Sequence, residues 1–240
     1  DCAAFEKKLN RHGYNVKIMR DDMPARYTVP TKANIIAEMK AMNAWLNARP
    51  RRQGWIVFAG HGTQQIDRSG EEEDGKDEAI VPADFQKNGL IKDDLLKEIN
   101  GTITQTTSSL MIFFDCCHSG TMMDLPYKLS HKLEGPMYPP GTLDSIGKVF
   151  CVSAALDEQV AYETSEGGVC TRSFLGSHVA GGNPAKLLVA MQNYADRKGM
   201  PQKISMHSTH PFGEGDAEFI EAPATNPFEL LLDCFFGGTA

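Results

Sequence analysis

Residues 110–121 constrain this chain most, because five apolar residues, Leu-Met-Ile-Phe-Phe, are followed at once by Asp-Cys-Cys-His-Ser-Gly-Thr. The apolar run predicts a strand that is buried on both faces, as in parallel sheets. In open α/β sheets, ligands and reactive groups lie just beyond the carboxyl ends of the strands. We therefore expect the polar residues, and above all the thiols of Cys116 and Cys117, to lie at such an edge.

A second apolar run, residues 55–59, ends in the same way, in Gly60-His61-Gly62. If the two strands are neighbours, His61 and Cys117 meet at one edge of the sheet. A thiol beside an imidazole ionises more readily and becomes a strong nucleophile. Either residue alone would be interpreted as structural, because buried cysteines are usually inert. The pair predicts a nucleophile and its base, with the amides of Gly62 and Cys117 as donors to an oxyanion.

Helical and strand-like patterns alternate along the chain. Helices are predicted at 1–12, 31–47, 93–99, 171–179 and 184–197, and strands at 14–19, 55–59, 110–114, 149–153 and 203–206. This alternation predicts an α/β fold, a mostly parallel sheet with helices on both faces, in a single domain over residues 1–240. Residues 65–77 and the Pro/Gly-rich residues 125–147 are predicted to be long loops, and residues 222–240 have no interpretable pattern.

The chain opens inside a predicted helix, whereas sheets of this kind usually begin with a strand. We therefore expect the first strand to be missing and the chain to begin partway into the natural protein. No apolar run reaches the length of a membrane span. The net charge of −7 argues against a nucleic-acid partner and suits basic peptides. The six cysteines have no metal-finger spacing. The chain is large enough to fold without disulfides, so reduced thiols and a cytoplasmic location are predicted.

The residues alone leave some alternatives open. In an extended chain Cys116 and Cys117 point to opposite sides, so only one of them can face the site. His118 is expected to be structural, and a zinc site is disfavoured because adjacent cysteines are poor tetrahedral ligands. Asp157 and Glu163 could border a cleft, but we favour solvated surface positions for both.

A group of acids forms a second candidate site. Its members come from three separate segments: Asp74, Asp77, Asp93, Asp94 and Asp124. Oxygen ligands without imidazole suit calcium. Asp93 and Asp94 could instead cap the helix that follows them, and the residues alone favour this simpler interpretation.

Three motifs together carry a resemblance to a known family: residues 58–64 (FAGHGTQ), residues 74–82 (DGKDEAIVP) and residues 115–120 (DCCHSG). In this order and at these separations the chain resembles a metacaspase, one of the caspase-like cysteine peptidases of protozoa, fungi, plants and bacteria. Residues 1–22 also resemble the first helix and the following strand of the family. The double cysteine and residues 87–91 look most like the kinetoplastid, type I-like members.

The resemblance implies a caspase-hemoglobinase fold without the first family strand and without a prodomain. It implies a catalytic dyad, with Cys117 as nucleophile and His61 as proton acceptor, and cleavage of protein or peptide substrates after Arg or Lys. Asp1 and Asp115 would form the acidic P1 pocket, and Ala59 stands where many members carry Ser. Activation by Ca²⁺ is implied as well, and the ligands fall by motif position on four acids: Asp77, Asp93, Asp94 and Asp124.

We expect a monomer that acts without nucleic acid or membrane. The alternative to a peptidase is a non-catalytic caspase-fold regulator that binds calcium or basic peptides. The intact pair of His61 and Cys117 argues against it, because a regulator needs neither. A hydrolase or transferase of another class that uses Cys117 is a third hypothesis.

Overall fold

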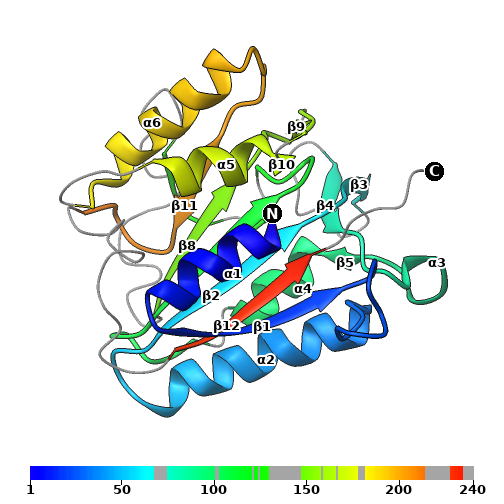
Figure 1. Cartoon of the computed structure of the whole chain (residues 1–240). Helices are drawn as coiled ribbons and strands as arrows, with labels where there is room; N and C mark the ends of the chain where they lie inside the picture. The colour runs from blue at the N-terminus through cyan, green and yellow to red at the C-terminus, as the bar shows by residue number, and fades with distance from the viewer. Residues whose placement is uncertain are drawn as a thin grey trace.

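The computed structural model describes residues 1–67, 75–100, 103–120, 122–123, 125–129, 147–157, 159–165, 167–177 and 182–213, and the backbone of residues 228–234. A seven-stranded sheet forms its centre, with the strands in the order β1-β12-β2-β6-β8-β11-β7 (Figure 1). Their bounds, in the same order, are Tyr14–Arg20, Phe228–Cys234, Gln53–Ala59, Ser109–Asp115, Lys148–Ser153, Ser205–Ser208 and Tyr127–Leu129.

The strands from β1 to β8 in this order pair in parallel, and β11 is antiparallel to both of its neighbours. The prediction of a mostly parallel sheet is therefore confirmed. Two small antiparallel sheets flank it, and they contain β3 (Gly62–Ile66), β4 (Lys76–Ile80) and β5 (Ile91–Lys92) in one and β9 (Glu163–Thr164) and β10 (Gly167–Gly168) in the other.

Helices cover both faces of the central sheet (Figure 1). One face packs against α1 (Cys2–Arg11), α5 (Val169–Gly176) and α6 (Pro184–Arg197), and the other against α2 (Lys32–Ala48) and α4 (Asp93–Asn100), while α3 (Phe85–Asn88) is a short outer helix. In β6, Met111 and Phe113 belong to the first of these two cores, and Ile112 and Phe114 to the second. The strand is apolar throughout because both of its faces are buried.

Local signals fixed several helix ends as predicted. Thr31 caps α2 by accepting a hydrogen bond from the amide of Asn34 at 3.3 Å. Asn183 caps α6 by accepting one from the amide of Lys186 at 3.0 Å, and Pro184 occupies the first turn of that helix. α5 begins two residues earlier than predicted, at Val169, and the last predicted strand lies at 205–208 instead of 203–206.

Two strands of the central sheet lie where none was predicted, and the five strands of the two small sheets were not predicted either. The short strand β7 falls inside the predicted loop 125–147, of which residues 130–146 lie outside the described part. β12, from the uninterpreted segment 222–240, lies between β1 and β2 and pairs in parallel with both. We expected a sheet that lacks one strand, and we did not predict that this C-terminal segment would form a strand of it.

The cysteines follow the prediction with one exception. Cys116, Cys151 and Cys170 are free and buried, and Cys117 is free and half-buried. Burial raises the pKa of the Cys151 thiol to about 12 and the pKa of the Cys170 thiol well above its usual value. Cys2 is disulfide-bonded, so the prediction that all thiols are reduced is wrong at this residue.

The described helices include none with the length and apolar character that crossing a membrane requires.

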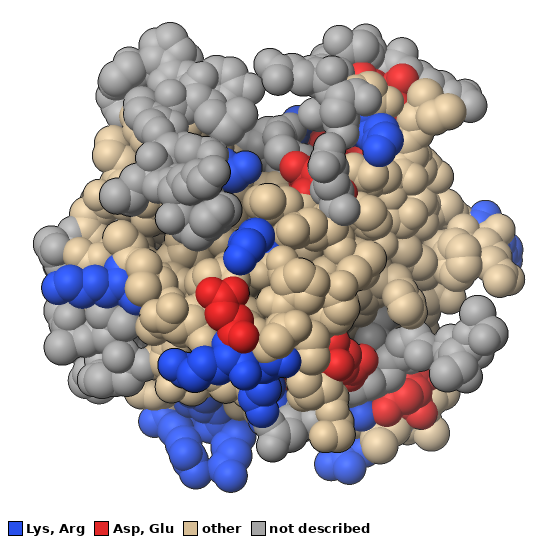
Figure 2. All heavy atoms as spheres, turned by 90° about the horizontal axis from the view of Figure 1, so that it is seen from above, with Lys and Arg blue, Asp and Glu red and all other residues tan. Residues whose placement is uncertain are grey.

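Figure 2 shows the face seen from above, where basic side chains gather toward one edge and acidic ones lie among them. This face therefore carries charges of both signs.

The imidazole of His207 is buried in β11. Its ring Nε2 lies 3.1 Å from Ser205 Oγ, and its partners across the sheet are Cys151 and Lys128. Burial, and then the charge of Lys128, lower the pKa of His207 from 6.5 to about 3. Between these two values the unfolded chain binds a proton that the folded chain does not, so folding stability falls as the pH falls.

His207→Gln is expected to remove this part of the acid sensitivity. The His207 contribution amounts to roughly 1.4 kcal/mol for each pH unit between about 6.5 and about 3. Urea unfolding at a series of pH values would measure the slope, with His12→Gln at the partly exposed end of α1 as the matched control. If His207→Gln and the original protein lost stability equally on acidification, the assignment to His207 would be wrong.

Candidate active site

The strands β2 and β6 bring the two predicted catalytic residues to one edge of the sheet. They are parallel neighbours in which Ala59 pairs with Asp115, and the amide of Gly60 continues the pairing to the Asp115 carbonyl at 3.3 Å. His61 and Cys117 each follow that last pair by two residues. The two side chains therefore leave adjacent strands at the same level.

A cavity of about 240 Å³ lies at this edge, and His61 and Cys117 both line it. The three predicted P1-pocket residues, Asp1, Asp115 and Ala59, line the same cavity. All five predicted catalytic and pocket residues are thus brought together. His61 is exposed and Cys117 is half-buried, so both are reachable from the solvent.

The two neighbouring thiols differ in environment. The Cys117 sulfur accepts a hydrogen bond from the amide of Ala161 at 3.3 Å. Cys116 also borders the cavity, but its side chain is only 1% exposed and packs into the core beneath α2 and α4. Burial raises the pKa of the Cys116 thiol well above its usual value, so this thiol stays protonated at neutral pH.

His118 serves the loop that carries Cys117. Its ring Nδ1 lies 2.5 Å from the Asp157 carbonyl, and its amide donates to the Gln159 carbonyl at 3.2 Å. Its backbone φ of +50° turns the chain sharply after the nucleophile position. These contacts support the structural role that the sequence predicted for His118.

Glycine is required at position 62 because two backbone segments meet there. A Cβ at Gly62 would lie 2.0 Å from the Cys117 carbonyl oxygen and 3.1 Å from Cys116 Sγ. β3 starts at this residue and turns away from the main sheet toward β4. The small sheet is thereby packed directly against the backbone of the thiol loop.

The floor of the cavity is built around the Asp115 carboxylate, which is 7% exposed. Its Oδ2 accepts hydrogen bonds from the Thr171 amide at 2.9 Å and the Thr171 hydroxyl at 2.6 Å. Burial nevertheless raises the pKa of Asp115, and the Thr171 hydrogen bonds oppose that rise only in part. Asp1 lies beside it and accepts from the Gly168 amide at 3.1 Å on both oxygens.

The sequence did not predict several of these contributors. Thr171 and Gly168 hold the two acids. Glu163 is exposed, in agreement with the predicted surface position, and it also lines the cavity. Cys170 lies buried in α5. The pair Gly167-Gly168 was the only local signal of a close backbone approach in this segment.

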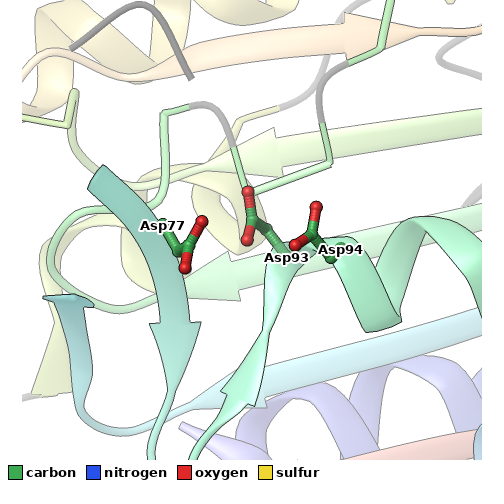
Figure 3. A group of neighbouring side chains, drawn as sticks. All are labelled: Asp77, Asp93 and Asp94. Atoms are coloured by element: carbon green, nitrogen blue, oxygen red, sulfur yellow. The ribbon is translucent and has the colours of Figure 1, made fainter. Parts of the chain in front are cut away.

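Three of the four predicted calcium ligands converge from two elements (Figure 3). Asp77 comes from β4, and Asp93 and Asp94 open α4, with one carboxylate oxygen from each lying within 4.8 Å of the others. Asp77 and Asp93 are buried, at 2% and 0% exposure. Helix capping alone does not require an acid from β4 at this place. Asp124, the fourth, lies outside the described residues.

Two lysines balance part of the negative charge of these three acids. Lys92 Nζ makes an ion pair with Asp77 Oδ2, and Lys97 Nζ lies 4.0 Å from Asp93 Oδ2. The hydrogen bond with Asp77 raises the pKa of Lys92. Buried carboxylates require compensating positive charge, and a set of carboxylate oxygens without imidazole or thiolate is a donor set that Ca²⁺ accepts.

Comparison with known proteins agrees with this architecture. The family model described as the metacaspase peptidase C14 domain matches residues 1–126. Metacaspase-1 of Kluyveromyces lactis is 36% identical over 203 residues, which cover 82% of this chain and 43% of that protein. Metacaspase-1 of Debaryomyces hansenii is 38% identical over 170 residues, which cover 68% of this chain and 36% of that protein. Each alignment spans less than half of the relative.

A solved structure shares the fold at low sequence identity. The crystal structure of protein GSU0716 from Geobacter sulfurreducens superposes with a TM-score of 0.51 and 18% identity, covering 77% of this chain and 75% of that one. Both of these metacaspase relatives are fungal, so the resemblance to kinetoplastid members stays a prediction. On the family match over residues 1–126 and the identity to Metacaspase-1 of Kluyveromyces lactis, the chain belongs to the metacaspase family of the C14 peptidases.

Proposed function

We propose that this chain is a monomeric, calcium-activated cysteine endopeptidase that cleaves protein or peptide substrates after Arg or Lys. The observation that carries the proposal is the single cavity lined by His61, Cys117, Asp115 and Asp1. A nucleophile, a base and two carboxylates in one cavity suit hydrolysis of a peptide bond next to a basic side chain.

Acyl transfer uses groups that the chain supplies. His61 takes the Cys117 thiol proton, and the sulfur attacks the carbonyl carbon of the scissile bond. His61 then gives the proton to the leaving amine as the C–N bond breaks, which leaves a thioester on Cys117. A water molecule that loses a proton to His61 hydrolyses the thioester and restores the thiol. The amide of Ala161 donates to the sulfur and holds it in position at the edge of the cavity.

Asp115 and Asp1 explain a preference for basic P1 residues. Thr171 engages Oδ2 of Asp115, and among the described residues no hydrogen-bond donor reaches Oδ1, which remains for a ligand. A guanidinium or ammonium group in the cavity would bring the pKa of Asp115 back down and keep it ionised. A P1 aspartate would meet like charge in the same place.

Calcium would be held by Asp77, Asp93 and Asp94, with Asp124 as the fourth ligand by motif. When bound, it would neutralise the charge of these carboxylates and would not take part in acyl transfer. Asp77 pairs with Gln65 across the β3–β4 hairpin, and β3 begins at Gly62, next to His61. Ordering the acid cluster would therefore steady the strand that adjoins the catalytic base.

A fluorogenic peptide that ends in Arg tests the function directly. We expect cleavage at millimolar calcium, within a range of about 10⁻⁴ to 10⁻³ M, and none after EDTA treatment or with Asp in place of Arg. Calcium binding without turnover would favour the non-catalytic regulator. Labelling of Cys117 by an electrophile without peptide cleavage would favour a hydrolase or transferase of another class.

Asp94→Ala is expected to raise the calcium concentration needed for half-maximal activity about tenfold, because it removes one of the converging carboxylates. A calcium titration of the peptidase rate measures the shift. Glu98→Ala, an exposed acid on the same helix, is the matched control and should leave the titration unchanged. An unchanged calcium requirement in Asp94→Ala would return Asp94 to a capping role.

A further inference from the structure

A short hairpin closes one side of the catalytic cavity. β9 and β10 pair antiparallel, with Glu163 opposite Gly168, and Thr164 Oγ1 donates to the Gly167 carbonyl at 3.1 Å. Gly168 lies against the pocket acids, since a Cβ there would be 2.2 Å from Asp115 Oδ2. The hairpin therefore fixes the backbone of Glu163 beside the residue that touches the floor of the pocket.

Backbone hydrogen bonds also hold the segment before the hairpin in place. The Tyr162 amide donates to Gln202 Oε1 at 2.9 Å, and the Val169 amide donates to the Tyr162 carbonyl at 2.9 Å. One residue earlier, the Ala161 amide donates to Cys117 Sγ. Glu163 thus follows, by two residues, the backbone group that touches the nucleophile, and it lines the same cavity.

The charges in the cavity favour a positively charged ligand. The carboxylates of Asp1, Asp115 and Glu163 line it, and no described residue forms an ion pair or hydrogen bond with the Glu163 side chain. Asp115 is only 7% exposed, and no described residue donates a hydrogen bond to its Oδ1. Two cations lie nearby, the Asp1 ammonium and Arg172, whose Nε is 3.3 Å from a Cβ placed on Gly167, and two cations do not balance three acids. A third cation, Arg20, is paired with Asp22.

We propose that Glu163 is a third acidic wall of the P1 pocket and that it makes the pocket prefer Arg to Lys. The guanidinium group is planar and has five N–H donors, so it can engage several carboxylates at once. The Lys ammonium is a compact point charge with three N–H donors, so it gains less from a third carboxylate. This inference rests on the proposed peptidase function and names its substrate preference.

Paired peptides that differ only in P1 test the preference. With Glu163→Gln, we expect kcat/KM for the Arg peptide to fall about tenfold, as for loss of one charge-assisted contact, and to fall less for the Lys peptide. The loss should appear in KM more than in kcat, and Glu163→Asp should restore part of it. Glu38→Gln, the same change on α2 at the opposite face of the sheet, should leave both peptides unchanged.

Equal losses for the two peptides, or a loss confined to kcat, would overturn the proposal. A second readout does not depend on peptide turnover: the rate at which iodoacetamide alkylates Cys117, followed by peptide mapping, with and without benzamidine. Benzamidine should protect Cys117, and Glu163→Gln should weaken that protection about tenfold. Protection that is absent, or equal in both proteins, would contradict the role of Glu163. Protection without any peptide cleavage would overturn the peptidase function and leave the cation pocket standing.

Discussion

Cys117→Ala is expected to abolish cleavage of the Arg peptide, with kcat/KM lowered at least about a thousandfold, as for other removed nucleophiles. Cys116→Ala is expected to retain most of the activity. Both thiols border the cavity, but only Cys117 is reachable there and accepts the Ala161 hydrogen bond. The buried Cys116 thiol has a pKa raised well above its usual value and stays protonated.

The pair of variants separates chemistry from packing. Cys116→Ala leaves a small gap in the core beneath α2 and α4, so its melting temperature should fall, with a stability loss of about 1 kcal/mol. Cys117→Ala should melt close to the unmodified protein and should also lose its rapid reaction with iodoacetamide. An active Cys117→Ala protein, or an inactive but well-folded Cys116→Ala protein, would reverse the assignment of the nucleophile.

The position of the site could be read from the sequence because it depends on local signals. Two apolar runs that end in glycine and polar residues predicted β2 and β6, and the edge where ligands bind follows from parallel pairing. The choice of Cys117 over Cys116 came from the family motif, since strand alternation alone left both open. Burial now supplies a physical reason for the same choice.

The contacts that shape the pocket could not be predicted in the same way. Thr171 donates a hydrogen bond to Asp115, which lies 56 residues earlier in the chain, and no local sequence pattern predicts such a contact. Glu163 resembles any surface acid until the hairpin places it beside Gly168. A sequence shows which side chains can carry charge, but tertiary packing decides which charges share a cavity.

β12 shows the same limit at the level of the fold. Its short apolar stretch is compatible with a buried strand, but short apolar runs do not distinguish strands from helices. Its partners β1 and β2 lie about 170 to 220 residues away in the chain, so nothing local identifies the gap between them. The register places the end of β12 beside Ala59, two residues before His61, and this links the C-terminal segment to the catalytic edge.

Gly62→Ala is expected to lower kcat/KM at least about a hundredfold while the protein still folds. The added Cβ would lie 2.0 Å from the Cys117 carbonyl oxygen, a distance that no real contact tolerates, so the thiol loop or β3 must move. That oxygen is a backbone atom, and the Cys117 carbonyl carbon lies 3.1 Å away as well, so moving the Cys116 side chain cannot relieve the clash. Because His61 precedes this residue, the movement separates base from nucleophile, and displacements of about 1 Å cost large factors in rate.

Peptide cleavage and thermal unfolding should be measured together on this variant. The matched control is Gly176→Ala at the end of α5, where a Cβ meets no atom within 4 Å, and it should be fully active. Cys117 should remain open to iodoacetamide in Gly62→Ala, because the sulfur is still present and only its position relative to His61 has changed. Activity near that of Gly176→Ala would show that β3 and the thiol loop are not packed as described, and that the catalytic edge does not depend on their contact.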